Sequence, residues 1–195
     1  QVRLNQVSQH FPAGHRIRIS ISTVYWPLAW PAPRPVKLSL HTAKSMVTLP
    51  VRSPRENDDR LRPFEDPETA PPGASAELEP EQHGWKVVRD LANDEASLIV
   101  EKNEGRVLFK EIGLEHASNS REMYTVYDND LDTLRGETEW HQEFQRGDWN
   151  ARTVTKTILT SDDTYFFIHA NLDAYEGDKR IFCRSWNQKI RRDLV

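Results

Sequence analysis

The positions of the prolines divide this 195-residue sequence into parts that can and cannot build a continuous sheet. All twelve prolines lie at or before residue 80, and none follows. Proline has no backbone N–H to donate to a neighbouring strand, so it is confined to sheet edges, bulges and loops. We therefore divide the chain into residues 1–52, a proline-rich stretch at 53–82, and a proline-free part at 83–195.

The first part contains a strictly alternating segment. After a Pro-Ala-Gly turn, Ile17, Ile19 and Ile21 alternate with arginines and serines. A period of two indicates a strand with one buried and one solvated face. Because this segment lies close to a first residue, Gln1, that is not methionine, we expect the sequence to be a piece of a longer protein. Strands are predicted at three places: residues 16–24, 36–40 and 45–51.

The middle stretch, residues 53–82, holds six prolines among acidic and small residues. Such a composition buries little surface and favours extended backbone. We expect a linker, or a strap that wraps over a neighbouring part of the molecule.

The last part, residues 83–195, predicts a meander of long antiparallel strands. Turn signals with Asp, Asn or Gly separate runs that are rich in aromatic and β-branched residues. We predict turns at residues 92–95, 103–105, 128–130, 146–148, 161–163 and 176–178. In residues 165–175, Phe166, Ile168 and Leu172 share an apolar face. The predicted fold class is all-β, with a partial jelly-roll or β-sandwich remnant followed by a long-stranded antiparallel meander that forms a sandwich or a curled sheet.

Composition narrows the possible partners. The net charge is −4 and no basic patch occurs, so we expect no nucleic acid. No apolar run reaches the roughly 20 residues that span a bilayer, and we expect no membrane partner. Cys183 is the single cysteine and cannot form an intrachain disulfide, which favours a cytoplasmic location.

Signatures of catalysis and cofactor binding are missing from the sequence. There is no Gly-x-Ser-x-Gly nucleophile elbow, no phosphate-binding glycine loop and no zinc-ligand spacing. We therefore predict that this chain is not an enzyme and assign no catalytic, cofactor-binding or metal-binding residue.

Two acidic clusters have both a functional and a structural interpretation. Asp128, Asp130, Asp132 and Glu139 match ligand positions of a calcium loop, but Thr133 stands where that loop needs glycine. Asp and Asn are also common in turns, and we favour that interpretation. Residues 137–143 place three glutamates and a histidine on one strand face, which is either an acid–base site or, as we favour, a solvated face.

Three aromatic residues on a proline-stiffened loop are the candidates for a partner interface: Tyr25, Trp26 and Trp30. Such side chains anchor protein partners, stack on sugar rings, or fold back onto their own core.

The sequence PAGHRIRISIS, which begins at Pro12, together with an aromatic-Pro loop and the Leu-Pro-Val of residues 49–51, carries a family resemblance. It resembles the C-terminal β-domain of the cocaine-esterase and X-Pro dipeptidyl-peptidase family of serine hydrolases. The resemblance implies a parent protein with an α/β-hydrolase catalytic domain, a helical cap and a jelly-roll domain. None of the motifs that carry the Ser-Asp-His triad occurs here.

We therefore expect a non-catalytic C-terminal accessory region of a serine hydrolase that cleaves acyl esters or X-Pro peptides. Its partner would be the catalytic domain of the parent chain. The alternatives are a ligand-binding β-sandwich module, with carbohydrate as one candidate ligand, and an independent hydrolase that uses residues 137–143. The edge of the strand at 16–24 is expected to pair with a second copy or to be covered by residues 53–82.

Overall fold

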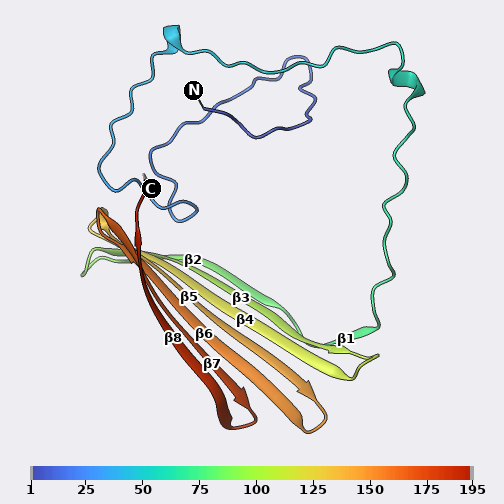
Figure 1. The fold of residues 1–195 in the computed structure, drawn as a ribbon, viewed down its shortest axis with the longest axis vertical. Coiled ribbons are helices and arrows are strands. Elements are labelled where there is room, and N and C mark those ends of the chain that lie inside the picture. Colours follow the sequence, from blue (N-terminus) through green and yellow to red (C-terminus); the bar gives the residue numbers. More distant parts are fainter. Residues whose placement is uncertain (1, 194–195) are drawn as a thin grey trace.

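The structure, a computed structural model, describes residues 2–193 and confirms the all-β class (Figure 1). Two short 3-10 turns, Thr42–Lys44 and Asp58–Arg60, precede the first strand. The eight strands are β1 Ser75–Glu79, β2 Gln82–Asp90, β3 Glu95–Phe109, β4 Leu114–Tyr127, β5 Asp130–Arg146, β6 Trp149–Ser161, β7 Tyr165–Glu176 and β8 Lys179–Arg191. β1 thus lies inside the stretch that the sequence suggested as a linker.

The strands form one antiparallel sheet. From β3 to β8 each strand pairs with the next, whereas β1 and β2 both pair with the outer edge of β3. β5, the longest strand, has 17 residues, against a usual five to six. Figure 1 shows the strands fanning out and twisting as a single layer, as expected for long antiparallel strands.

Most of the predicted turns are hairpin turns in the structure. The β4–β5 turn places Asp128 and Asn129 at positive φ, a conformation that these residue types tolerate well. The turn predicted at residues 103–105 is wrong, because β3 continues through it with a shift of register toward β1 and β4. Gly105 makes that passage possible: its φ is +69°, and a Cβ there would lie 2.1 Å from the Glu79 carbonyl oxygen.

The two faces of the sheet differ in chemistry. The pairing register places Tyr124, Gly136, Leu159 and Ile168 on one face. We call this the apolar face; on β5, β6 and β7 it consists of residues 134–144 (even), 151–161 (odd) and 166–174 (even). The opposite side, which carries Glu137 and Lys156, is the charged face. The sequence pattern at residues 165–175 predicted this division.

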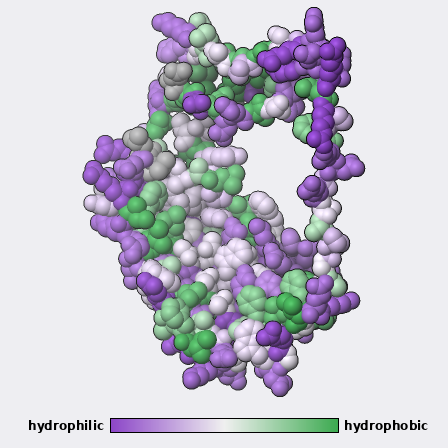
Figure 2. All heavy atoms as spheres, turned by 45° about the vertical axis from the view of Figure 1, so that its right-hand side comes forward, coloured by the Kyte–Doolittle hydropathy of each residue, from purple (hydrophilic) through white to green (hydrophobic). Residues whose placement is uncertain are grey.

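The hydrophobic core is small because a single-layer sheet cannot bury much apolar surface. Val100, Leu134 and Pro31 are the buried apolar side chains among residues 2–193, and Leu134 is only 2% exposed. The accessible surface is 16703 Å², whereas a compact 22.7 kDa protein has about 9,500 Å². Figure 2 shows one cause, an open window between the extended segment that leads to β1 and the body of the sheet.

The three strands predicted within residues 1–52 do not form. In this stretch the structure has extended backbone, one 3-10 turn and a single bridge between Tyr25 and Ala29. Ile17, Ile19 and Ile21 are about half exposed. A strand needs a neighbour to satisfy its N–H and C=O groups, and no segment of residues 2–193 runs beside this one. A jelly-roll remnant is therefore absent from the described residues.

Candidate functional site

The loop with the two tryptophans is the place where the N-terminal region meets the sheet. Within residues 2–74, side chains are withdrawn from solvent only at 26–27, at 30–33 and at Asp58. A tight turn forms the loop, in which the Ala29 N–H donates to the Tyr25 carbonyl at 2.8 Å. We call residues 25–33 the Trp-Pro anchor.

Aromatic contacts seat the Trp-Pro anchor on the apolar face. Trp26 and Trp30 pack edge to face with ring centroids 4.6 Å apart. Trp26 also meets Tyr124 of β4 at 5.8 Å, and Trp30 meets Phe166 of β7 at 5.7 Å. Gly136 lies beneath them, since a Cβ there would sit 3.8 Å from the Trp30 ring. A methyl group there would make ordinary van der Waals contact with the indole, so Gly136 lies under the ring without being required by it.

Polar contacts fix the orientation of the Trp-Pro anchor. The Trp30 indole N–H donates to Ser161 Oγ at 2.8 Å. The Arg192 guanidinium donates to the same oxygen at 3.1 Å, to the Asp162 carbonyl at 2.7 Å and to the Pro31 carbonyl. It also lies over the Phe166 ring at 4.9 Å. Arg192 is 9% exposed, and this burial lowers the pKa of its guanidinium.

The sequence singled out Trp26 and Trp30, either for a partner interface or for packing on their own core, but not the residues of the sheet that contact them. Ser161 is the last residue of β6 and Arg192 follows β8, and neither has a local pattern that singles it out. Only the sheet register brings them together. Tyr25 does not join the contact and is 66% exposed.

The fold also changes the ionisation of Tyr124, which contacts Trp26. Partial burial, followed by a 2.7 Å hydrogen bond from its hydroxyl to Glu122 Oε2, raises its pKa to about 12. The neutral phenol is therefore the form that the anchored structure favours.

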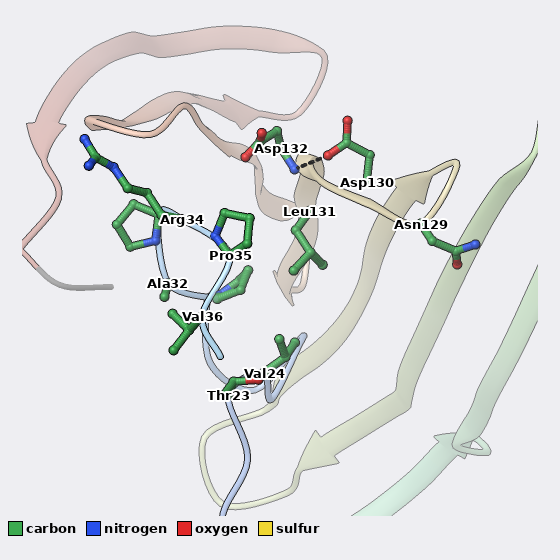
Figure 3. A pocket seen from close by; sticks show the side chains of 12 residues that line it. Thr23, Val24, Ala32, Arg34, Pro35, Val36, Asn129, Asp130, Leu131 and Asp132 are labelled. Atoms are coloured by element: carbon green, nitrogen blue, oxygen red, sulfur yellow. Dashed lines mark hydrogen bonds between the residues drawn. The ribbon is translucent and has the colours of Figure 1, made fainter. Parts of the chain in front are cut away.

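A cleft of about 270 Å³ adjoins the Trp-Pro anchor (Figure 3). Its walls are residues 23–24, residues 31–36 and the β4–β5 turn, residues 129–132. Figure 3 shows Leu131 facing the prolines, with Arg34 at one end and Asp130 and Asp132 at the other. Mixed apolar walls with charged ends suit an interface between segments better than an enclosed substrate site.

The acidic string of the calcium alternative forms the same β4–β5 turn. The Asp132 N–H donates to Asp130 Oδ1 at 2.9 Å, the local bonding typical of turn aspartates. Glu139 lies well along β5, and among residues 2–193 no three acidic, histidine or cysteine side chains are placed to hold a metal.

The glutamates of residues 137–143 form ion pairs across the charged face. Glu137 contacts Arg135 at 2.8 Å and Lys156 at 2.5 Å, and the Lys156 hydrogen bond lowers its pKa. Glu143 contacts Arg106 at 2.7 Å. His141 Nε2 lies 2.7 Å from Glu139 Oε1, with both side chains about 40% exposed.

The second cleft, about 540 Å³, lies over this face and includes Glu139 and His141. Its Glu101 is paired with Lys86 at 2.8 Å, and no nucleophile with an adjacent base is assembled there. Among residues 2–193 there is also no helix long and apolar enough to cross a bilayer.

Comparison with protein families gives one match. Residues 1–87 match the model of the X-Pro dipeptidyl-peptidase C-terminal non-catalytic domain, which confirms the resemblance stated on residues 12–51. The match continues past residue 52 through the proline-rich stretch and ends within β2. Neither curated proteins nor solved structures gave a match.

Proposed function

We propose that this chain is an accessory region of an α/β-hydrolase-type serine hydrolase, because residues 1–87 match the model of the X-Pro dipeptidyl-peptidase C-terminal non-catalytic domain. The parent enzyme would hydrolyse X-Pro peptides or acyl esters. The chain itself would contribute no reacting group. The family match is the observation that carries this proposal.

The exposure of the N-terminal region supports a role in covering a catalytic domain. The alternating isoleucines at 17, 19 and 21 are about half exposed although their pattern is that of a buried strand face. A sheet of the parent enzyme would supply the missing neighbour, satisfy the backbone groups and bury those side chains.

The Trp-Pro anchor would then join the family-matched region to the sheet at 75–191. Trp26 and Trp30 are engaged with Tyr124 and Phe166, which leaves Tyr25 as the member that faces outward. We propose that Tyr25 contacts the catalytic domain, whereas the two tryptophans hold the loop on the sheet. The engagement of both indoles argues against a sugar-stacking role.

The gene that encodes the chain provides the test. We expect the reading frame upstream of Gln1 to encode a Gly-x-Ser-x-Gly elbow, and the full product to hydrolyse a chromogenic X-Pro or acyl ester substrate. The chain alone should show no turnover. A full product that loses neither thermal stability nor activity when translation stops before Gln1 would contradict the supporting role.

A further inference from the structure

The sheet itself builds the place where the Trp-Pro anchor sits. We call Tyr124, Gly136, Ser161, Phe166 and Arg192 the receptor site. Tyr124 is paired with Gly136 across β4 and β5, and Ser161 with Phe166 across β6 and β7. Because hairpin pairing fixes these positions, the receptor site forms whether or not a segment occupies it.

The sheet also orients Arg192 without help from the anchor. Its backbone N–H donates to the Thr164 carbonyl at 2.9 Å. Its guanidinium donates to Ser161 Oγ at 3.1 Å and to the Asp162 carbonyl at 2.7 Å. The group is thereby held so that Nη2 donates to the Pro31 carbonyl. A donor that is already oriented loses little entropy on binding, so the receptor site is preorganised for a backbone carbonyl.

The receptor site recognises the two indoles of the anchor by shape and by one polar group. Trp26 packs edge to face on Tyr124, and Trp30 on Phe166. The Trp30 N–H donates to Ser161 Oγ at 2.8 Å, and phenylalanine has no such donor. Both aromatic positions are therefore specified, the second one for tryptophan.

The prolines of the anchor are also specified, whereas the two residues between the pairs are not. Pro31 is the one fully buried residue within residues 2–74, and Pro27 is half-buried. Leu28 is 76% exposed, and Ala29 is exposed as well. The contacts therefore select the pattern Trp-Pro-x-x-Trp-Pro, in which x is open to most residues.

The anchor is held by its own contacts, since the chain that follows it adds little. Residues 37–74 are exposed except for Asp58, which pairs with Arg52 in the same stretch. Figure 2 shows the open window between this segment and the sheet. A tether of this kind supplies an effective concentration of about 1 mM. For the anchor to fill the site in about nine chains of ten, its intrinsic dissociation constant must be about 0.1 mM or lower.

We propose that the receptor site binds peptides of the form Trp-Pro-x-x-Trp-Pro in trans, and that the chain's own Trp-Pro anchor occupies and blocks it. The ligand is an exposed proline-rich segment of another protein with the same two aromatic–proline pairs. Proline-rich segments are stiff and lose little entropy on binding, and aromatic-lined sites commonly bind them. Because ligand and anchor compete, the apparent affinity falls with the fraction of chains whose site is open.

Fluorescence anisotropy of a labelled synthetic peptide, residues 23–35, titrated with the whole chain tests the proposal. In the double variant Trp26→Ala/Trp30→Ala the anchor no longer fills the site, and we expect a dissociation constant of about 0.1 mM. Wild type should bind the peptide about tenfold more weakly, because its own anchor competes. A peptide with alanine at both tryptophan positions is the control and should not bind.

Ser161→Ala in the double variant locates the bound peptide. It removes the acceptor of the indole N–H and should weaken binding about fivefold. Ser185→Ala, on the charged face of β8, is the matched control and should leave binding unchanged. Far-UV circular dichroism confirms that the sheet of each variant is folded. If the double variant does not fold, Trp30→Ala alone takes its place, because it keeps the contact of Trp26 with Tyr124.

Peptide binding that is stronger in the folded variant than in wild type, and that Ser161→Ala weakens, supports the proposal. No binding to the folded variant at about 1 mM peptide overturns it. Equal binding to wild type and variant, or binding that Ser161→Ala leaves unchanged, also overturns it, because the peptide would then lie elsewhere. No hydrolase enters the measurement, so its failure would leave the proposed accessory role standing.

Discussion

Residues 2–74 and the sheet at 75–191 contain similar alternating patterns yet reach different states. In the sheet, the apolar residues of β7 lie between two paired strands. In the first region, Ile17, Ile19 and Ile21 have the same spacing and no paired neighbour. The difference teaches that alternation specifies which face a strand would bury, whereas strand formation depends on a partner with matching hydrogen bonds. In the β3–β8 meander, tight hairpins place each strand beside the next one. Residues 16–24 need a neighbouring strand from outside residues 2–193.

The largest contrast is expected from truncating one apolar side chain in each region. Leu134→Ala should lower the free energy of unfolding by about 3 kcal/mol, because Leu134 is buried and its loss leaves a cavity. Ile19→Ala should change it by less than about 0.5 kcal/mol, since Ile19 is half exposed. Urea unfolding followed by circular dichroism measures both. Equal losses would mean that the first region contributes a core of its own.

The next effect concerns how the two regions join at β1. Gly105→Ala should destabilise the sheet by about 2 kcal/mol or more, because φ there is positive and the new Cβ would meet the Glu79 carbonyl oxygen.

Gly113→Ala is the matched control, with φ of +61° and open space around its Cβ, and should cost about 1 kcal/mol. Thermal unfolding of the two variants compares them. If Gly113→Ala proves the more damaging, close packing of β1 on β3 is not what makes Gly105 necessary.

A smaller effect is expected at the Trp-Pro anchor. Trp30→Ala removes the ring contact with Phe166 and the hydrogen bond to Ser161, and should lower sheet stability by only about 1 kcal/mol. It should nevertheless speed chymotrypsin cleavage after the exposed Leu28 several-fold, because the loop is no longer held. Tyr25→Ala, in the same loop but outside the contact, should be cleaved after Leu28 at the wild-type rate. Unchanged cleavage in Trp30→Ala would show that the anchor does not hold the loop.

The smallest expected effect occurs at alkaline pH and concerns Tyr124, which contacts the Trp-Pro anchor. The folded pKa of Tyr124, about 12, exceeds its usual value of 10.0, so the fold favours the neutral phenol. The stabilisation is therefore complete below pH 10 and is lost as the pH rises toward 12. Wild type should lose stability relative to Tyr124→Phe across that interval, as measured by urea unfolding at each pH. A constant difference would contradict the perturbed ionisation.

Much of the sheet could be predicted from sequence because its information is local. The turn residues at 128–130 and 176–178 and the alternation at 165–175 define strands, turns and faces without reference to distant residues. The prediction of a turn at Gly105 was wrong, because glycine occurs both in turns and at bulges within a strand. Only the pairing of β1 with β3 shows that the strand continues there.

Only one side of the contact between the Trp-Pro anchor and the sheet could be predicted from sequence. Trp26 and Trp30 stand out as aromatics on a stiff loop, whereas Ser161 and Arg192 become a receptor only when β6, β7 and the chain after β8 are side by side. The strands at 16–24, 36–40 and 45–51 failed for the opposite reason: their pattern was read correctly as a face to be buried, but the neighbour is not among residues 2–193.

Hydrogen exchange, followed by mass spectrometry on the whole chain, tests the contrast between the two regions most directly. Backbone hydrogen bonds of residues 2–73 are all local, whereas β4–β7 are paired on both sides. We expect amides of β4–β7 to exchange orders of magnitude more slowly than those of residues 16–24 and 45–51. Within residues 2–73, any protection should centre on the Trp-Pro anchor. Slow exchange across residues 16–24, equal to that of β5, would contradict the account, because it would mean that the alternating segment already has its strand partner within this chain.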